Sequence, residues 1–565
     1  YLANKLMVLV DGRSAYSPNF SGVLWNTLQF PLENIERIEV IRGPGGSIWG
    51  MNAVNGVINI ITRSAMATQG STVSAGYGNA TGPFAMARHG GKLDEDIFFS
   101  SYVTAQRGSA SAVAGGDSAQ DGYRDVGAGL RIDSHRGGDS WMLIGNLFHS
   151  RADGVGLVPD VSAPGSGYLR RTAILDDLSG IDVQGRFTRL LDDGSELQLN
   201  TSWTHSDLDS AMLADERQDI VDLEVQHRLM AAGRHDITWG AGYRWFHDQV
   251  TDALVVRIQK PQETLQVASL FAQDEYAMRP DLRLTVGARV DHQKYTGAEL
   301  QPSARLLWNL DARHSLWWAY SQARRAPSRG ERTADYQLGV LAPGSTTNPS
   351  PFPAKLEVRG SDAVVSEHLT AYETGYRGQP GERLFVDASL FLHRYRSLRC
   401  TTAGDVETAS LPAYLVAPAY FSNQCRLDIR GLELSADWRP GHRWHLQGGY
   451  TLNENSHFSG GDPIYSSFVP RHILFLRSGW RLNRATDVDL WLRRVGEREV
   501  PYAAPIDAYT SLDLRVARRI AKGVELSLVG QNLLDARHEE YISQVPGFPP
   551  AQIRRGVYAQ FRLNY

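Results

Sequence analysis

The sequence predicts an all-β membrane protein, a transmembrane β-barrel of about 22 antiparallel strands with a mixed α/β plug at its N-terminus. Three observations lead to this fold class. From about residue 68 onward, segments of roughly ten to fourteen residues alternate apolar and polar side chains, as membrane-crossing strands do. The connections alternate between tight turns and long polar stretches such as 152–177, 324–367 and 397–426. The first 65 residues follow a different pattern.

The alternation is clearest in residues 221–229, where Val221, Leu223 and Val225 share one face and Asp222 and Glu224 share the other. In a membrane barrel the apolar face meets lipid and the polar face lines the lumen. Strand length favours this interpretation over a soluble sheet, because soluble strands usually have about five or six residues. A soluble propeller is the alternative, but no blade-like repeat of about 40–50 residues is visible.

Bulk composition agrees with a barrel. The mean hydropathy of the 565 residues is −0.31, and no apolar run reaches the length of about 18 residues that a helical span needs. A net charge of −4 gives no reason to expect nucleic acid as a partner. No secretory signal opens the chain, so we interpret Tyr1 as a processed or truncated start.

The first 65 residues predict the plug, so we divide the chain into a plug, 1–65, and a barrel, 66–565. A lumen of this size is typically plugged. A strand of apolar residues only is typical of a strand that is buried on both faces. We expect such a strand over Leu6–Val10, a short helix over Leu32–Ile35, and further strands over Arg37–Ile41 and Val57–Thr62.

Two stretches of the predicted plug resemble TonB-dependent outer-membrane receptors. They are Ile35-Glu36-Arg37-Ile38-Glu39-Val40-Ile41-Arg42-Gly43-Pro44 and Ala53-Val54-Asn55-Gly56-Val57-Ile58-Asn59-Ile60-Ile61-Thr62, in which Asn55 replaces the first of two usual glycines. In the predicted barrel, Tyr320-Ser321-Gln322-Ala323-Arg324-Arg325-Ala326-Pro327-Ser328 is similar to another stretch of the family.

The resemblance implies a receptor in the outer membrane of a Gram-negative bacterium that actively imports a scarce ligand. The ligand binds outer loops and the plug apex, and TonB supplies the energy through an N-terminal box. We expect that box, and the first part of the plug, to lie upstream of Tyr1. The resemblance implies a monomer in outer-membrane lipid, without a resident cofactor or metal. No enzyme motif is visible, and neither an enzyme nor a passive porin has a use for the plug.

A removable plug needs an interface that is strong but breakable, and charge-assisted hydrogen bonds in a wet lumen suit this requirement. The plug offers Arg42 and Arg63, and the wall offers Glu373 and Glu433 on lumen-facing positions. Because the family has a plug–barrel ion cluster, we expect these four residues to meet.

A ferric siderophore is the favoured ligand, with cobalamin, haem, another metal chelate or a glycan as alternatives. The haem pattern of the family is incomplete, because residues 326–367 contain no histidine. Six scattered histidines (His149, His205, His247, His292, His393, His457) lack the spacing of a metal site. Guanidinium and aromatic groups suit an anionic, aromatic-rich ferric chelate. The candidate ligand-binding residues are Arg324, Arg325, Arg329, Arg332, Tyr336, Tyr414 and Tyr420.

The only two cysteines, Cys400 and Cys425, flank the predicted outer loop 401–424. The strands on either side of this loop should be antiparallel neighbours, which brings Cα atoms to about 4.5–5.5 Å, within disulfide range. Outer-membrane proteins pass through an oxidising compartment. We therefore expect a disulfide at the base of this loop.

Overall fold

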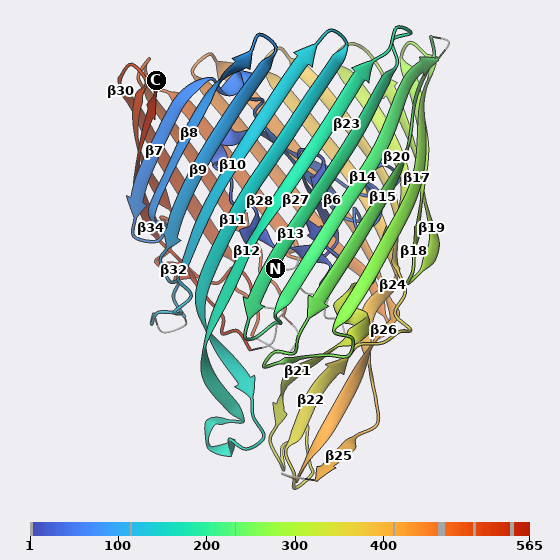
Figure 1. Ribbon diagram of the computed structural model, residues 1–565, viewed down its shortest axis with the longest axis vertical. Helices are drawn as coiled ribbons and strands as arrows, with labels where there is room; N and C mark the ends of the chain where they lie inside the picture. The colour runs from blue at the N-terminus through green and yellow to red at the C-terminus, as the bar shows by residue number, and fades with distance from the viewer. Residues whose placement is uncertain are drawn as a thin grey trace.

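A computed structural model describes residues 4–113, 116–231, 233–410, 413–460, 469–500, 504–542 and 547–565. Its main body is a closed antiparallel barrel of 22 wall strands (Figure 1). The last strand pairs with both its predecessor and the first wall strand, which closes the barrel. The wall strands are β7 Gly70–Gly78, β8 Gly82–Asp94, β9 Ile97–Gly108, β10 Tyr123–Arg136, β11 Asp139–Pro159, β12 Leu169–Leu190, β13 Glu196–Ser210, β14 Glu216–Ala231, β15 His235–Val250, β17 Gln262–Arg279, β18 Leu282–Gln293, β19 Gly297–Asn309, β20 His314–Arg325, β23 Glu367–Gly381, β24 Leu384–Ala403, β26 Ala413–Gly441, β27 Trp444–Ser459, β28 His472–Arg481, β29 Thr486–Val495, β30 Tyr509–Ala521, β31 Val524–Gln531 and β34 Gly556–Asn564.

The burial pattern of the wall is inverted relative to a soluble protein. Large apolar side chains such as Leu223 and Leu270 are exposed on the outer face, whereas Asp182 and Gln218 are buried on the inner face. In β14, which contains the alternating segment 221–229, Asp222 accepts a hydrogen bond of 2.6 Å from Arg244 Nε on the lumen side. The predicted assignment of apolar faces to lipid and polar faces to the lumen is therefore confirmed.

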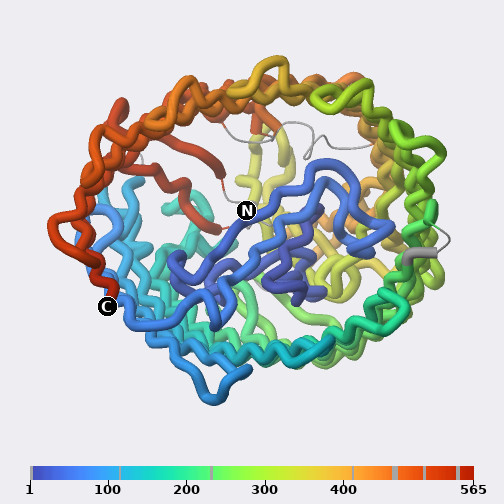
Figure 2. Tube along the Cα trace, turned by 90° about the horizontal axis from the view of Figure 1, so that it is seen from above, coloured from blue at the N-terminus to red at the C-terminus, as the bar shows by residue number. Residues whose placement is uncertain are grey.

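The plug is a small mixed sheet with strand order β2-β1-β6-β5, and it lies inside the barrel ring (Figure 2). β1 and β6 are parallel, and β5 is antiparallel to β6. Side chains of β1 enter one apolar cluster at Met7 and Leu9 and a second at Val8 and Val10, so this strand is buried on both faces as predicted. The plug strands are β1 Leu6–Val10, β2 Arg13–Ser14, β3 Tyr16–Ser17, β4 Gly22–Val23, β5 Ile35–Arg42 and β6 Gly56–Thr62.

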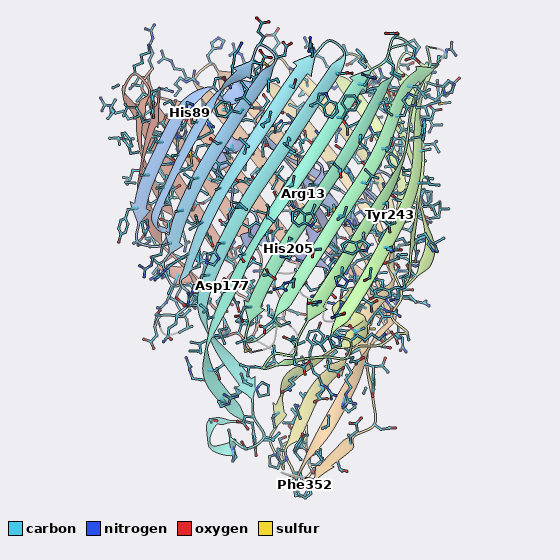
Figure 3. All side chains as sticks on the ribbon, viewed as in Figure 1. Arg13, His89, Asp177, His205, Tyr243 and Phe352 are labelled. Carbon is cyan, nitrogen blue, oxygen red and sulfur yellow. The ribbon has the colours of Figure 1, made fainter. Side chains whose placement is uncertain are left out.

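The two ends of the barrel differ sharply (Figure 1). Tight turns join the strands at one end, whereas at the other the pairs β11–β12 and β24–β26 extend well beyond the wall. We take the long end as the outer side. Phe352 marks the tip of the longest projection (Figure 3). The further strands are β16 Val256–Ile258, β21 Ala334–Leu341, β22 Ala354–Arg359, β25 Glu407–Ser410, β32 Arg537–His538 and β33 Ile553–Arg554.

The long polar stretches 324–367 and 401–424 are not irregular loops but contain paired strands. The first part of β26 pairs in parallel with β22 and antiparallel with β25, and β21 pairs with β22. Pairing satisfies the backbone donors and acceptors that a long irregular loop would leave to water. The projections are therefore small β-sheets.

Helices are few and short. Within the described residues, no helix is long and apolar enough to cross a membrane. The segment predicted as helical after Pro31 forms a single 3₁₀ turn. Residues 46–49, which follow Gly43, Pro44 and Gly45, form one turn of α-helix. The helices are η1 Trp25–Thr27, η2 Leu32–Asn34, η3 Met66–Thr68, η4 Pro164–Ser166, α1 Gly46–Trp49 and α2 Arg329–Thr333.

Candidate functional site

The plug meets the outer half of the wall through the loop that precedes β6. Asn52 adopts a left-handed backbone conformation with φ of +77°. Its backbone N donates to Arg324 O at 2.8 Å, and its Oδ1 accepts from Ala326 N at 3.0 Å. The residue that precedes the second family-like stretch of the plug is thus in direct contact with the family-like stretch of the wall.

Asn55, the residue in place of a glycine, has a different role from the one that its residue type suggests. Asparagine tolerates left-handed backbone well, but Asn55 is absent from the positive-φ residues, which include Asn52. Its Oδ1 accepts a hydrogen bond of 2.9 Å from the Tyr395 hydroxyl of β24. Its backbone N donates to Lys5 O at 2.7 Å. Asn55 therefore links the plug to the wall through its side chain.

Five charged side chains form what we call the outer-wall charge cluster: Lys5, Arg325, Glu331, Glu367 and Arg399. Lys5 Nζ lies 2.8 Å from Glu367 Oε2, and Arg325 Nε donates to Glu367 Oε1 at 2.8 Å. Arg325 Nη2 also contacts Glu331 Oε1 at 3.0 Å, and Arg399 forms a close ion pair with the same carboxylate. The cluster joins the plug, three wall strands and helix α2.

Helix α2 holds Glu331 in place. Ser328 and Glu331 form a capping box, in which Glu331 N donates to Ser328 Oγ at 3.1 Å and Ser328 N donates to Glu331 Oε2 at 2.9 Å. Burial raises the pKa of Glu331, but Arg325 and Arg399 outweigh burial and hold that pKa below its ordinary value. Burial lowers the pKa of Lys5, and Glu367 opposes that shift. Glu331 is therefore held as a carboxylate.

The cluster changes the assignment of the predicted ligand-binding arginines. Arg325 and Arg329 are fully buried, and Arg329 Nε lies 2.8 Å from Asp248 Oδ2. Arg324 Nε lies 3.2 Å from Glu299 Oε2, and Arg332 Nη1 donates to Val364 O at 2.7 Å. A guanidinium that is buried against a carboxylate has no free face for a ligand. Arg325 and Arg329 therefore belong to the wall's own ion pairs and not to a ligand surface.

The three predicted tyrosines lie on the outer projections. Tyr336 packs edge-on against Phe421, with ring centroids 6.0 Å apart. Tyr414 sits opposite Ala409 in the β25–β26 hairpin, and Tyr420 lies opposite Arg359 in the pairing of β22 with β26. Tyr420 is well exposed. Tyr414 and Tyr420 therefore remain candidates for a surface that faces the exterior.

Inside the lumen, Arg42 of the plug and Glu433 of the wall form a close ion pair. The side chain of Arg42 is 56% exposed, so water reaches this contact. Glu373 lies beside the plug turn at Gly43, but its Oε1 is hydrogen-bonded, at 3.1 Å, to Nε2 of His393 in the wall. Of the four residues expected to meet, the structure brings together Arg42 and Glu433, with Glu373 next to the same turn.

Arg63 does not join them. The register pairs Arg42 with Gly56, whereas Arg63 follows Thr62 at the other end of β6. From Gly56 to Thr62 a strand at about 3.3 Å per residue spans roughly 20 Å. The prediction did not allow for the antiparallel arrangement of β5 and β6, in which the C-terminal ends of the two strands lie far apart. Arg63 lines a small cavity at the inner end of the plug, near Asn34 and Arg131.

The predicted disulfide is absent from the structure. Cys400 and Cys425 are buried thiols in one apolar cluster that also contains Val54 of the plug. Cys400 lies opposite Ser422 and Cys425 lies opposite Leu398, with an irregularity in the ladder between the two pairs. The expectation placed the cysteines at directly facing positions, and the shifted register removes that geometry.

The described part of the chain does not indicate a metal site. Among the described residues, no group of three or more His, Cys, Asp and Glu side chains could hold a metal ion. Four of the six histidines singled out in the sequence contact a neighbouring polar side chain: His149, His205, His247 and His393. His205 Nδ1, for example, lies 3.0 Å from Asp219 Oδ1.

Sequence reasoning missed four of the five members of the outer-wall charge cluster: Lys5, Glu331, Glu367 and Arg399. Only Glu331 carries a local signal, because Ser328 followed three residues later by Glu331 is the pattern of a capping box. The other three come together only through the fold.

Comparisons with known proteins agree with this architecture. Residues 67–533 match the family model "TonB dependent receptor-like, beta-barrel", and residues 3–57 match the "TonB-dependent Receptor Plug Domain". The chain belongs to the TonB-dependent receptor family. This family comprises non-enzymatic transporters of the Gram-negative outer membrane, and membership implies interaction with TonB.

The relatives found include two proteins whose names refer to iron. The iron-regulated outer membrane virulence protein of Vibrio cholerae is 24% identical over 94% of this chain and 81% of its own length. The ferric enterobactin receptor of Pseudomonas aeruginosa is 23% identical, with the same coverage. The crystal structure of the siderophore receptor PirA from Acinetobacter baumannii shares the fold with a TM-score of 0.76 and 16% identity, over 100% of this chain and 91% of the other.

Proposed function

We propose that this receptor imports a ferric siderophore across the outer membrane with energy supplied through TonB. The observation that carries the proposal is the contrast between the two attachments of the plug. Arg42 meets Glu433 in a water-accessible part of the lumen, whereas the outer-wall charge cluster is largely buried. Water can replace the first contact as the plug moves. This suits a channel that stays shut until energy is applied.

The names of the relatives support iron as the cargo. Receptors for ferric enterobactin and for siderophores, and an iron-regulated protein, match nearly all of this chain. A ferric siderophore is cargo here, not a resident cofactor. Because the identities are low, the chemistry of the ligand has to be argued from this chain's own outer surface.

That surface offers tyrosine rings on the projecting sheet. Tyr420 is exposed to the exterior and lies opposite Arg359 in the register. The Arg359 guanidinium lies 2.7 Å from Glu407 Oε1 and 3.0 Å from Glu357 Oε2, so these two carboxylates occupy it. Phenol rings suit a ligand with aromatic rings. We assign first contact with the ligand to Tyr420 and Tyr414.

Ligand binding to the full-length receptor in detergent tests the proposal. Quenching of tryptophan fluorescence would be titrated with a ferric catecholate, a ferric hydroxamate, haem and cobalamin. We expect saturable binding of a ferric siderophore and weaker binding by Tyr420→Ala. Arg377→Gln, at the inner rim, is the matched control and should bind like the wild type. Saturable binding of cobalamin or haem alone would reassign the cargo.

A further inference from the structure

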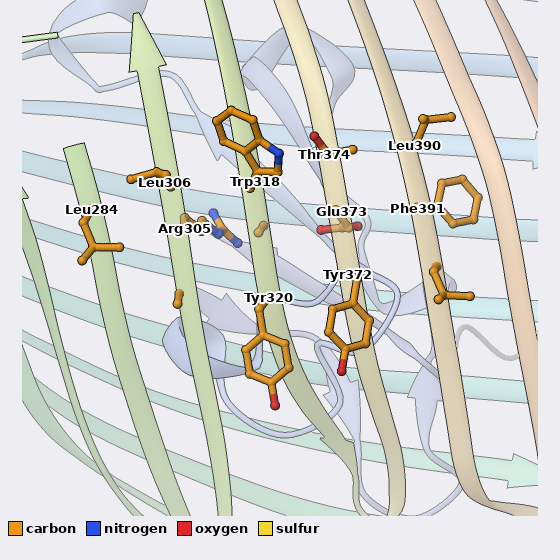
Figure 4. A pocket seen from close by; sticks show the side chains of 13 residues that line it. Leu284, Arg305, Leu306, Trp318, Tyr320, Tyr372, Glu373, Thr374, Leu390 and Phe391 are labelled. Carbon is orange, nitrogen blue, oxygen red and sulfur yellow. The ribbon is translucent and has the colours of Figure 1, made fainter. Parts of the chain in front are cut away.

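The outer face of the barrel carries an open apolar hollow of about 560 Å³ across β18, β19, β20, β23 and β24 (Figure 4). This volume is in the range of about 300–1,000 Å³ that small-molecule sites have. Leu306, Trp318, Thr374 and Leu390 lie side by side in one row of the register. Ala304 contributes only a methyl group between larger side chains, which helps to leave the hollow open.

The hollow faces away from the lumen. Glu373 lies between Tyr372 and Thr374 in β23 and points to the plug turn at Gly43. Because side chains alternate along a strand, Tyr372 and Thr374 point outward. Trp318, Tyr372 and Leu390 are all well exposed on that side. In a membrane barrel this is the surface that lipid covers.

Toward the outer side of the membrane, the side chains along the hollow change from aliphatic to aromatic and then to cationic. Tyr320 and Tyr372 pack with ring centroids 5.5 Å apart at the next row of the register, toward the outer side. Two residues beyond Leu392, the exposed Arg394 places its guanidinium carbon 5.7 Å from the Tyr372 ring. Asp428 of β26 lies opposite Arg394 in the register, but its ion pair, at 2.5 Å, is with Arg396. Within the described residues no carboxylate lies within ion-pair distance of Arg394.

We propose that this surface binds a phosphate-bearing anionic lipid of the outer leaflet, with its acyl chains in the hollow and its phosphate on Arg394. Guanidinium groups recognise phosphate by paired, charge-assisted hydrogen bonds. Tyrosine and tryptophan rings favour the boundary between the apolar core and the headgroups. The order apolar, aromatic and cationic from the membrane centre outward therefore matches the order of groups along an anionic lipid.

The same observations disfavour a second copy of the chain as the occupant. A two-fold dimer through this face would bring Arg394 and Arg396 close to the same two residues of the second copy. Like charges at an interface oppose association. A lipid phosphate would supply a second anion to Arg394 and Arg396, which have Asp428 between them. A bound lipid would also brace β23 and β24, which hold Glu373 and His393 beside the plug turn on their inner faces.

Native mass spectrometry of the full-length receptor tests the proposal. The receptor would be released from neutral detergent after exposure to phosphatidylglycerol or phosphatidylcholine with identical acyl chains. We expect about fivefold greater retention of phosphatidylglycerol, since one arginine near a membrane surface contributes about that factor. Arg394→Gln should abolish this preference, and Ala304→Trp, which fills the hollow, should lower retention of both lipids.

The control variant is Arg217→Gln, which removes another exposed outer-rim arginine that is ion-paired with Asp207 at 2.7 Å. It should retain lipid like the wild type. The proposal is overturned if Arg394→Gln keeps the full preference or if Arg217→Gln loses it equally. Displacement of phosphatidylglycerol by inorganic phosphate would show a site for a free anion, and a dimer without lipid would show an interface between copies. Heat-dependent electrophoretic mobility would verify that each variant is folded.

Discussion

Lys5 of the plug lies 2.8 Å from Glu367 of the barrel wall, and both side chains are almost wholly screened from water. Glu367 also binds Arg325, which in turn binds Glu331 of helix α2. The plug, the wall and an outer projection thus share one buried set of charges. Parting them would leave a charge buried without its partner, which costs about 3–5 kcal/mol. The buried charges therefore hold the plug firmly at this point. At Arg42, by contrast, water can replace the ion pair with Glu433.

The first prediction concerns Glu367→Gln. The amide cannot neutralise Lys5 and Arg325, so the free energy of unfolding should fall by about 3–5 kcal/mol. Chemical unfolding in detergent, followed by tryptophan fluorescence, measures this loss. Glu407→Gln is the matched control, because Glu407 also pairs with an arginine but in an exposed position. Equal effects of the two substitutions would refute the special role of the buried cluster.

The second prediction concerns the exchangeable contact. Arg42→Glu should place two carboxylates together in the lumen and weaken closure of the plug, and Glu433→Arg should do the same with two cations. Ion conductance of the receptor in planar bilayers should rise for each single variant. The double exchange Arg42→Glu with Glu433→Arg should restore low conductance. If the double variant leaks as much as the two singles together, the two residues do not act as a pair.

The barrel and the plug strands could be predicted because their signals are local. The alternation in β14 and the continuous apolar run of β1 fix which faces are buried, whatever their neighbours. The separation of Arg63 from Arg42 depends on β5 and β6 being antiparallel, which no local pattern states. The burial of Arg325 and Arg329 depends on Glu367 and Asp248, which lie tens of residues away in sequence. Cys400 and Cys425 do not face each other because the register of β24 against β26 shifts between them, and no local pattern in the sequence predicts that shift.

The third prediction concerns acid. The pKa of Glu331 is held below its ordinary value of 4.5, so the unfolded chain binds the proton more tightly than the folded one. The stability from this carboxylate is fully present above pH 4.5 and is lost as the pH falls through the lower folded value. Melting temperature measured across this range should drop in acid. Glu331→Gln should start lower and lose less on acidification; a wild-type slope in this variant would contradict the assignment.

The fourth prediction concerns Gly43, whose φ is +76° and whose added Cβ would lie 2.5 Å from Glu373 Oε1. Gly43→Ala should cost about 1–2 kcal/mol for the backbone alone, and more for displacing Glu373 from His393. Gly137→Ala is the control, because Gly137 has φ of +60° and no atom within 4 Å of an added Cβ. Chemical unfolding should show the larger loss at Gly43. With Glu373→Ala also present, that loss should shrink to the level seen at Gly137.

Uptake of radioactive iron by cells that lack their other iron receptors tests the central claim most directly. Cells that produce the full-length receptor would be given a ⁵⁵Fe-labelled siderophore found in the binding titration, with TonB present or deleted. The account predicts accumulation of ⁵⁵Fe that needs both the receptor and TonB and that stops when the inner membrane is uncoupled. Receptor-dependent uptake that continues without TonB would contradict it, as would no uptake of any ferric siderophore alongside energised uptake of cobalamin or haem.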